Sequence, residues 1–309
     1  MNQQVQTIVV AASVLLPGPL AAQAVDSAAV LRARACPSCA EWNAPREPFR
    51  IHGNTYYVGT HGLAAILITS PDGHILIDAG LPESVIPITG SIGALGFRVE
   101  DVRLILNSHA HFDHAGGIAA LQRASGAAVA ASPASAVVLE RGTSGPDDPQ
   151  YGVALAFPPA TAVRTIADGD VLRVGALAVT AHFTGGHTPG GTSWSWRSCE
   201  GERCLDLVYA DSQTPVSADD FLYTRSSAYP AALDDFARGH ARLERLPCDI
   251  LLTPHPGASS LWQRLEQRDR GAAPALVDGL VDGDACRRYA AAARERLARR
   301  VASEAASPP

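Results

Sequence analysis

The 309-residue chain contains no lysine, so its 25 basic residues are all arginine, and 31 acidic residues outnumber them. A formal net charge of -6 gives no reason to expect a nucleic-acid partner, because proteins of that kind usually present a basic patch. No apolar run in the sequence is long enough to cross a bilayer. With 47% hydrophobic and 18% charged residues, the composition is that of a globular protein and excludes disordered and fibrous classes.

The N-terminus has the composition of an export signal. Residues 7–20 are mostly apolar and too few to span a bilayer, and Ala22, Gln23 and Ala24 supply small residues at a cleavage spacing. Residues 1–6 carry no Arg or Lys, which departs from the usual pattern, so an uncleaved arm is the alternative. We predict a signal peptide over residues 1–24, export to the periplasm, and a single monomeric domain over residues 25–309.

The chain has six cysteines, and an even number behind a signal peptide indicates disulfides. Cys199 and Cys204 flank a predicted hairpin turn, which a disulfide between them could close. Cys248 precedes a predicted buried strand and Cys286 lies near the start of the last predicted helix. A bridge between these two would attach that helix to the core.

Cys36 and Cys39 form a CxxC motif ahead of a predicted loop at residues 42–45. A redox CxxC normally opens a helix, and a cysteine zinc site would need partners that are not nearby. We therefore expect either a local disulfide or two free thiols.

The apolar pattern predicts a mixed α/β protein with two similar halves, each running from strands to helices. Strands are expected at residues 51–58, 63–69, 74–77, 102–106, 128–131, 171–174, 177–183, 192–198, 205–210 and 250–253. Helices are expected at residues 82–95, 115–124, 133–141, 231–246, 258–268 and 284–302. Residues 143–159 are rich in Gly, Pro and Asp and predict a long loop. Two sheets packed face to face with helices outside would bury these apolar faces.

Four possible metal ligands lie within six residues directly after the strand predicted at residues 102–106. Because residues two apart at a strand end point to the same side, His109 and His111 can bind one cation. Asp113 and His114 follow on the turn into the next helix and can face a second cation. Imidazole and carboxylate groups suit Zn²⁺.

Two further histidines lie on tight loops at strand ends. His187 belongs to a Gly-rich loop at residues 184–191, and His255 stands between two prolines. Such loops hold a side chain with little conformational freedom and are common positions for functional residues. We expect the other histidines to be structural, including His182, which alternates with apolar neighbours in a predicted strand.

The order HxHxDH, then Gly-His-Thr-Pro-Gly, then a strand-end histidine resembles the metallo-β-lactamase superfamily. Residues 107–117, 186–196, 209–217 and 247–258 are similar to subclass B3 in particular. This resemblance implies an αββα four-layer sandwich, with mixed sheets, that holds two Zn²⁺ ions per chain. It also implies six ligands. The first ion takes His109, His111 and His187, and the second takes Asp113, His114 and His255.

The same resemblance implies an activity, which is hydrolysis of the β-lactam amide of penicillins, cephalosporins and carbapenems by a metal-bound hydroxide. Such an enzyme confers antibiotic resistance. Asp113 would act catalytically by orienting the nucleophile, and Ser212 and Thr214 match the positions that contact the substrate carboxylate. Gln150, with the rest of loop 143–159 and residues 221–223, would form the pocket walls.

The alternative is another dizinc hydrolase of this fold, either a lactonase or a glyoxalase II-like thioesterase. In those relatives an Asp bridges both metals at the position where subclass B3 has a Ser. The resemblance places Ser212 there, so Asp211 either touches the metals or orients a ligating histidine. A mononuclear iron dioxygenase on the same scaffold is usually intracellular, which the signal peptide and paired cysteines disfavour. A nuclease of the superfamily would usually carry added nucleic-acid-binding regions.

Overall fold

The computed structural model describes residues 36–269 and 279–306. The predicted signal peptide at residues 1–24 lies outside these described residues. Within the described ranges, no helix is both long and apolar enough to cross a membrane.

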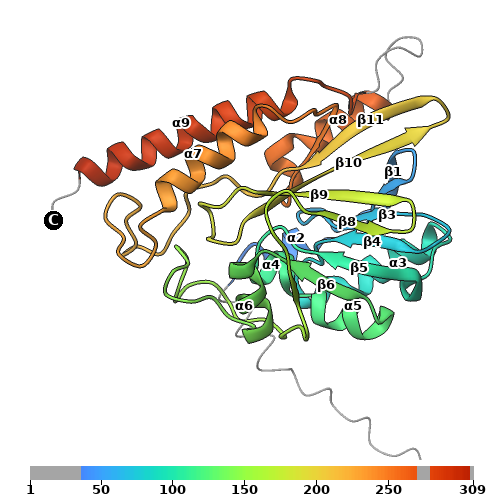
Figure 1. Ribbon diagram of the computed structural model, residues 1–309, viewed down its shortest axis with the longest axis horizontal. Helices are drawn as coiled ribbons and strands as arrows, with labels where there is room; N and C mark the ends of the chain where they lie inside the picture. Colours follow the sequence, from blue (N-terminus) through green and yellow to red (C-terminus); the bar gives the residue numbers. More distant parts are fainter. Residues whose placement is uncertain (1–35, 270–278, 307–309) are drawn as a thin grey trace, which may run out of the picture.

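Two mixed sheets form the centre of the described chain (Figure 1). The first contains, in spatial order, β1 (Phe49–His52), β2 (Thr55–Tyr57), β3 (Ile66–Ile68), β4 (His74–Ile77), β5 (Val102–Leu106), β6 (Ala128–Ala131) and β7 (Arg164–Thr165). It is antiparallel up to β4 and parallel from there on. The second has the order β12-β11-β10-β9-β8, with β8 (Val171–Val174), β9 (Leu177–Phe183), β10 (Thr192–Glu200), β11 (Arg203–Tyr209) and β12 (Ile250–Leu252). Only its β11–β12 pair is parallel.

Helices cover the outer face of each sheet (Figure 1). Their bounds are α2 (Cys39–Trp42), η1 (Pro82–Ser84), α3 (Val85–Ala94), η2 (Val99–Asp101), α4 (Phe112–Ala115), α5 (Ile118–Ser125), α6 (Pro133–Arg141), α7 (Ala232–Leu243), η3 (Pro256–Ser259), α8 (Leu261–Asp269) and α9 (Ala285–Ala306). Residues of α3, α5 and α6 pack with Ile105 and Val129 of the first sheet. Residues of α7 and α9 pack with Val208 and Leu251 of the second.

The largest apolar core lies between the sheets. Ile75, Ile77 and Leu104 from the first sheet belong to one buried cluster with Trp194 and Leu207 from the second. Strand β5 therefore buries residues on both faces, towards the other sheet and towards the helices, as its continuous apolar run predicts. With helices outside both sheets, the predicted αββα sandwich is confirmed.

The prediction of one strand over residues 51–58 is wrong, because this run is the hairpin β1–β2. Gly53 makes its turn with a φ of +50°. A Cβ on Gly53 would lie 2.4 Å from the carbonyl oxygen of Cys199, so the turn depends on a close approach of the two sheets. That approach is tertiary, and the local apolar pattern does not reveal it.

The predicted helix at residues 115–124 starts earlier and is broken in two. Helix α4 begins at Phe112, so Asp113 and His114 lie on it and not on a turn before it. The break falls at Gly116, where a Cβ would lie 2.4 Å from both the Phe112 oxygen and Pro82. Pairing of the Gly117 amide with the Gly80 carbonyl then redirects the chain into α5. The other departures are smaller. The short elements α2 and β7 were not expected, and α9 ends four residues later than predicted.

All six cysteines are paired. Cys199–Cys204 closes the β10–β11 hairpin and Cys248–Cys286 joins the start of β12 to α9, both as predicted. Cys36 and Cys39 form a local disulfide, which is one of the two states that we expected for the CxxC motif.

Candidate metal centre

The loop that carries the first histidines is fixed by a buried carboxylate, Asp78, at the end of β4. Asp78 accepts hydrogen bonds from the Ser108 amide (2.7 Å), the Ser108 hydroxyl (2.6 Å) and the Asn107 side chain (3.1 Å). The Tyr209 hydroxyl of the second sheet donates a fourth at 2.8 Å. These bonds hold the loop after β5 in one conformation. Sequence reasoning missed Asp78, although an acidic residue directly after a buried strand was a visible signal.

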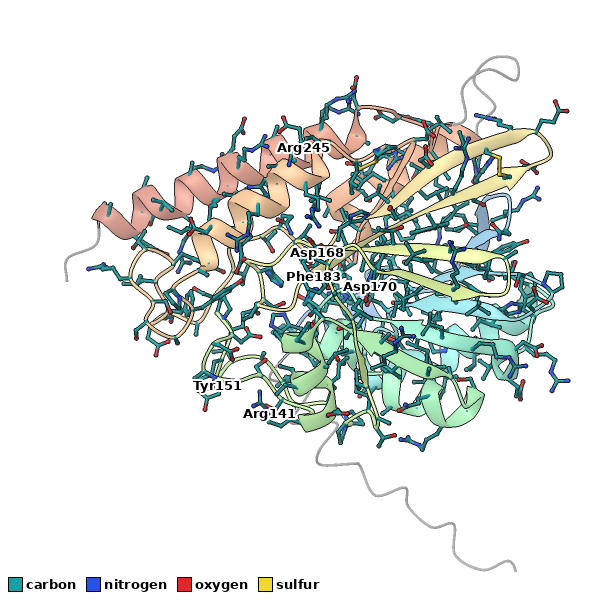
Figure 2. The ribbon with its side chains drawn as sticks, in the orientation of Figure 1. Arg141, Tyr151, Asp168, Asp170, Phe183 and Arg245 are labelled. Carbon is teal, nitrogen blue, oxygen red and sulfur yellow. A yellow bond between two sulfur atoms is a disulfide. The ribbon has the colours of Figure 1, made fainter. Side chains whose placement is uncertain are left out.

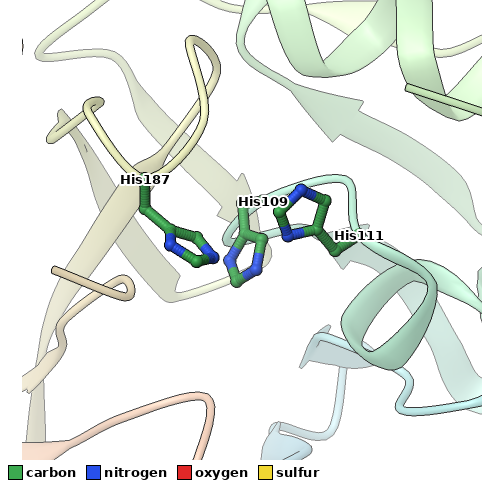
Figure 3. Close-up of side chains that lie close together, drawn as sticks. All are labelled: His109, His111 and His187. Carbon is green, nitrogen blue, oxygen red and sulfur yellow. The ribbon is translucent and has the colours of Figure 1, made fainter. Parts of the chain in front are cut away.

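Three buried histidines come together beyond this loop (Figure 3). The candidate ligand atoms of His109, His111 and His187 all lie within 4.8 Å of one another. His187 reaches the other two from the loop between β9 and β10 because Gly186, with a φ of +125°, passes directly against Phe236. A Cβ on Gly186 would lie 2.4 Å from that ring. The structure thus brings together all three histidines predicted for the first ion.

A second group of ligand atoms shares His109 with the first. His109, Asp113 and His114 also place their atoms within 4.8 Å of one another. His255 is outside that tight group, but its Nε2 lies 3.3 Å from Oδ2 of Asp113. Its ring centroid is 4.8 Å from that of His114. All six residues predicted as ligands therefore lie in one cluster.

Two of the histidines are oriented by carboxylates. Nδ1 of His109 lies 2.7 Å from Oδ1 of Asp211, and Nε2 of His111 lies 2.9 Å from Oδ2 of Asp148. Beside a bound cation both carboxylates would be ionised, and an ionised carboxylate only accepts, so the ring nitrogen that faces it would carry the proton. Nε2 of His109 and Nδ1 of His111 are then left as acceptors for a cation. Asp148 was not predicted, because nothing in the sequence links it to a histidine 37 residues away.

Backbone carbonyls orient two more rings in the same way. His187 donates from Nδ1 to the Thr214 carbonyl at 2.8 Å, and His255 donates from Nδ1 to the Gly62 carbonyl at 3.2 Å. In each ring Nε2 is left as the acceptor. Four imidazoles thus turn an unprotonated nitrogen away from their protein partners, which is the usual arrangement around a metal.

Unpartnered buried atoms support a cation at this position. Among the described residues, neither ring nitrogen of the fully buried His114 has a partner in hydrogen-bond geometry, although its Nε2 lies 3.3 Å from Oδ2 of Asp113, and Oδ2 of Asp211 has no hydrogen-bond partner either. Buried polar atoms are normally paired, so each such atom requires an explanation. A bound metal would supply the missing interaction for His114. It would also balance Asp113 and Asp211, whose ion pairs in the described part of the chain are with histidines only.

The electrostatics favour the protonation states that bind metals. Burial lowers the pKa of His187 to about 3, with the charge of His111 adding to the effect, and burial lowers the pKa of His109 well below its usual range. Burial acts to raise the pKa of Asp113, but His114 and His255 beside it hold that pKa well below its usual value. The pKa shifts thus favour the metal-binding form at His109, His187 and Asp113. Burial acts to lower the pKa of His111, but the Asp148 carboxylate raises it above its usual value, so a metal would have to displace a proton there.

Asp211 lies behind His109 and belongs to neither ligand group. Its amide donates to the Ser193 hydroxyl at 2.9 Å, and its carbonyl accepts from the Tyr289 hydroxyl at 3.0 Å. A Cβ on Gly191 would lie 2.4 Å from Oδ2 of Asp211, so the carboxylate is tightly enclosed. Burial raises the pKa of this carboxyl well above its usual value. The geometry makes Asp211 the residue that orients His109, and it gives no support to a metal bridge.

We predict that Asp211→Asn weakens metal binding by about tenfold, the lower end of the range for residues that orient metal ligands. The amide keeps the shape and an acceptor for His109 but loses the negative charge. Competition with a chromophoric chelator measures the affinity. Asp206→Asn, a half-buried position in β11, the strand that ends two residues before Asp211, is the control, and equal affinities for the two variants would contradict the assignment.

The residues predicted to bind substrate lie around the same cluster. Nε2 of Gln150 is 3.4 Å from Nδ1 of His111. The Thr214 hydroxyl is 3.4 Å from Nδ1 of His187. Ser212 is 7% exposed, next to Asp211. Gln150 and Thr214 therefore lie against the cluster, and Ser212 stands directly after the residue that orients His109.

A cavity of about 300 Å³ lies next to Asp148, the residue that orients His111, and none of the six candidate ligands is among its described lining residues. Asp148 and Tyr151 line one side, and Phe221 and Arg225 line the other. Tyr151 projects from the loop that follows α6 (Figure 2). A hydrogen bond of 2.8 Å from the Ala218 amide to the Pro149 carbonyl joins the two sides.

Only part of the predicted pocket wall lines this cavity. Of the wall at residues 221–223, Tyr223 is 3% exposed and packs in an internal cluster with Phe236. Phe157, in the predicted loop, is buried in the core beneath the first sheet. Both side chains stabilise the segments that carry them, and neither forms a surface of the cavity.

Comparisons with known proteins agree with this fold and cluster. The family model described as the metallo-beta-lactamase superfamily matches residues 59–270. The structure of Rm3 metallo-beta-lactamase is 55% identical, with a TM-score of 0.84 over 87% of this chain and 98% of that one. MEM-A1, described as a subclass B3 metallo-beta-lactamase from a soil metagenome library, is 49% identical, with a TM-score of 0.83 over 86% of this chain and 99% of that one. SMB-1, a metallo-beta-lactamase solved in a complex with mercaptoacetic acid, is 43% identical, with a TM-score of 0.80 over 85% of this chain and 99% of that one.

The αββα fold and the paired ligand groups define a hydrolase scaffold with a metal centre. The chain belongs to the metallo-beta-lactamase superfamily and, within it, to subclass B3. The family predicted from the sequence is therefore confirmed. Metal binding follows from that membership, and the cluster of His109, His111 and His187 fits it.

Proposed function

We propose that this protein hydrolyses the amide bond of β-lactam antibiotics, including penicillins, cephalosporins and carbapenems, with two zinc ions. The observation that carries the proposal is the pair of ligand groups that share His109 within a chain 55% identical to Rm3 metallo-beta-lactamase. Such an activity would confer antibiotic resistance.

The residues that would hold the two ions follow from the cluster. His109, His111 and His187 would hold the first, and Asp113, His114 and His255 the second. Three protein ligands per ion leave positions open, which is typical of catalytic and not of structural zinc. When bound, zinc supplies a Lewis acid that makes water nucleophilic near neutral pH and polarises a carbonyl oxygen.

The chain's own side chains would orient the reactants. The Asp113 carboxylate, held ionised between His114 and His255, can accept a hydrogen bond from the attacking water and so aim it. We propose that Ser212 and Thr214 bind the substrate carboxylate and that Gln150 contacts the substrate at the rim of the cavity. A volume of about 300 Å³ is at the lower end of ligand pockets, as suits a compact bicyclic substrate.

The test is hydrolysis of a carbapenem and of nitrocefin by purified protein, with EDTA and then with added zinc. We expect turnover that EDTA abolishes and that zinc restores. Absence of turnover by fully zinc-loaded protein would overturn the proposal, and lactones and thioesters would be the next substrates. Metal analysis of the active protein tests the number of ions, with two zinc per chain expected.

We also propose that residues 1–24 direct export to the periplasm and that residues 25–309 form one monomeric domain. Three disulfides support export, because such bonds persist in oxidising compartments. The N-terminal sequence of protein recovered from the periplasm tests the cleavage site and should begin at Val25. Recovery of uncleaved protein from the cytoplasm would contradict this proposal.

A further inference from the structure

A buried acidic residue lies far from the metal cluster, in the last turn of α9. Glu304 is 3% exposed, although the end of a surface helix is usually solvated. Its carboxylate accepts hydrogen bonds from the Tyr223 amide (3.0 Å), the Thr224 amide (2.9 Å) and the Thr224 hydroxyl (2.9 Å). A single side chain thus satisfies two successive backbone N–H groups of a loop 80 residues earlier in the chain.

Arg300, one helical turn before Glu304, holds the same loop by different atoms. Its Nε lies 2.6 Å from Oε1 of Glu304. Its Nη2 donates to the Ser217 hydroxyl (2.7 Å) and to the Phe221 carbonyl (2.9 Å). The guanidinium carbon is 5.5 Å from the centre of the Tyr223 ring, a cation–π distance. Together these contacts attach both ends of residues 217–224 to the helix.

The loop held in this way forms one side of the cavity next to Asp148, the carboxylate that orients His111. Ala218, Phe221 and Leu222 line it, opposite Asp148 and Tyr151. The loop contains no helix or strand, so its backbone groups depend on partners elsewhere. Charged hydrogen bonds from α9 supply several of those partners. Loops without such bonds open readily and sample other conformations.

The six candidate metal ligands take their support from other residues. His109 and His111 depend on Asp211 and Asp148, and the loop after β5 depends on Asp78. Within the described part of the chain, the hydrogen bonds and ion pair of Glu304 and Arg300 reach none of those residues. Loss of the helix contacts should therefore change the cavity wall and leave metal binding intact.

We propose that Arg300 and Glu304 are positioning residues that fix the wall at residues 217–224 and thereby set the affinity for substrate. This inference rests on the proposed β-lactam hydrolysis for its substrate and on the described contacts for its mechanism. The end of α9 would then influence substrate binding through the loop, although neither Arg300 nor Glu304 would touch the substrate.

The first test is the kinetics of Glu304→Ala with nitrocefin and a carbapenem. We expect KM to rise about tenfold while kcat and zinc content stay close to wild type, the pattern of an interaction made equally in ground and transition states. Glu304→Gln keeps the shape of the side chain and one acceptor oxygen, so its KM should fall between those of wild type and Glu304→Ala. It also tests the proposal should the alanine variant fail to fold.

The matched control is Glu295→Ala. Glu295 forms an ion pair with Arg299 at the same spacing on the same helix, but that pair is exposed, at 3.9 Å, with side chains 74% and 69% accessible. The control should leave KM unchanged. Equal KM values for Glu304→Ala and Glu295→Ala would overturn the inference, and so would a fall in zinc content or kcat at unchanged KM.

Amide hydrogen exchange is a second readout that does not depend on activity. In Glu304→Ala, peptides covering residues 217–224 should exchange faster with and without zinc, while peptides of β5 and α4 should not change. Unchanged exchange in the loop would overturn the inference. If wild-type protein turns over no β-lactam although the exchange difference is present, the proposed function fails, and with it the substrate part of the inference, while the contact itself stands.

Discussion

Alanine at His109 is expected to remove metal from the cluster and to lower kcat/KM for nitrocefin by a factor on the order of 10³. His109 is the one residue shared by both ligand groups, so its loss weakens the two positions together. Metal ions contribute several kcal/mol of transition-state stabilisation, and each 1.36 kcal/mol corresponds to a factor of about ten in rate. Kinetics together with zinc content measured by mass spectrometry would test the prediction.

His182→Ala is the matched control for this variant. His182 is also a partly buried histidine, and its Nε2 lies 2.7 Å from the Ser195 hydroxyl within the second sheet. It lies outside both ligand groups, so the control should keep its zinc and its turnover. Thermal unfolding of both variants, compared with metal-free wild type, separates loss of metal from loss of fold. An His109→Ala protein that retains zinc and turnover would contradict the assignment of the site.

His255→Ala should have a smaller effect on zinc content. This side chain is 35% exposed, and its described contacts with the cluster are with Asp113 and the ring of His114. Its loss should release the second ion and leave the first, which is held by three buried histidines. The difference between the two variants in zinc per chain therefore tests whether the cluster holds two separable ions.

The candidate ligands could be predicted from the sequence because four of the six are nearly contiguous. The motif from His109 to His114 follows a buried strand directly, and the other two histidines stand on constrained loops. Among the residues that support these ligands, Asp211 was expected either to orient a histidine or to touch the metals, whereas Asp78 and Asp148 were not predicted. Tyr209 meets Asp78 across 131 positions and Asp211 meets His109 across 102, so these pairs exist only once the two sheets are packed.

The fold was predictable where local pattern decides the structure. Alternating strands and helices, the long loop at residues 143–159 and the disulfides Cys199–Cys204 and Cys248–Cys286 are present as expected, and Cys36–Cys39 takes one of the two states expected for it. The errors fall where a glycine permits a close tertiary approach. Gly53 turns against Cys199 and Gly116 turns against Pro82, and neither neighbour is visible in the local sequence. The role of Glu304 could not be predicted from the sequence for the same reason. Its carboxylate meets the loop that forms the cavity wall only in the folded chain.

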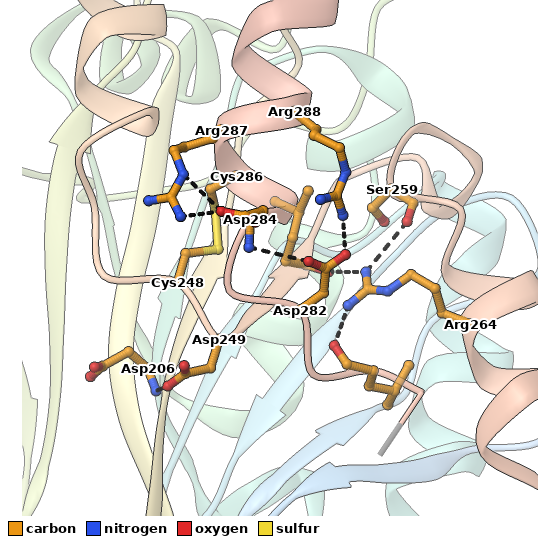
Figure 4. Close-up of a disulfide and its surroundings, with 12 residues drawn as sticks. Asp206, Cys248, Asp249, Ser259, Arg264, Asp282, Asp284, Cys286, Arg287 and Arg288 are labelled. Atoms are coloured by element: carbon orange, nitrogen blue, oxygen red, sulfur yellow. Dashed lines mark hydrogen bonds and ion pairs between the residues drawn. A yellow bond between two sulfur atoms is a disulfide. The ribbon is translucent and has the colours of Figure 1, made fainter. Parts of the chain in front are cut away.

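Replacement of both Cys248 and Cys286 by serine is expected to lower the free energy of unfolding by about 4 kcal/mol, from the chain entropy released when a loop of this length opens. The two cysteines are 38 positions apart. They join the start of β12 to the first turn of α9 (Figure 4). Both belong to a buried cluster that also contains Leu251 and Tyr289. Ion pairs of Arg287 with Asp284 and of Arg288 with Asp282 lie beside the disulfide and are exposed, so they compensate little.

Urea unfolding of the oxidised protein measures this loss, and Cys199→Ser/Cys204→Ser is the internal comparison. Those cysteines are only 5 positions apart, so the same entropy relation gives about 2 kcal/mol. The long-range bridge also anchors the helix whose Tyr289 hydroxyl holds Asp211. The Cys248/Cys286 variant should therefore lose activity at a lower urea concentration than the other pair. If the two double variants unfold at the same urea concentration, the Cys248–Cys286 disulfide stabilises the protein no more than the Cys199–Cys204 disulfide does. Packing of α9 against the core would then account for the position of this helix without the disulfide.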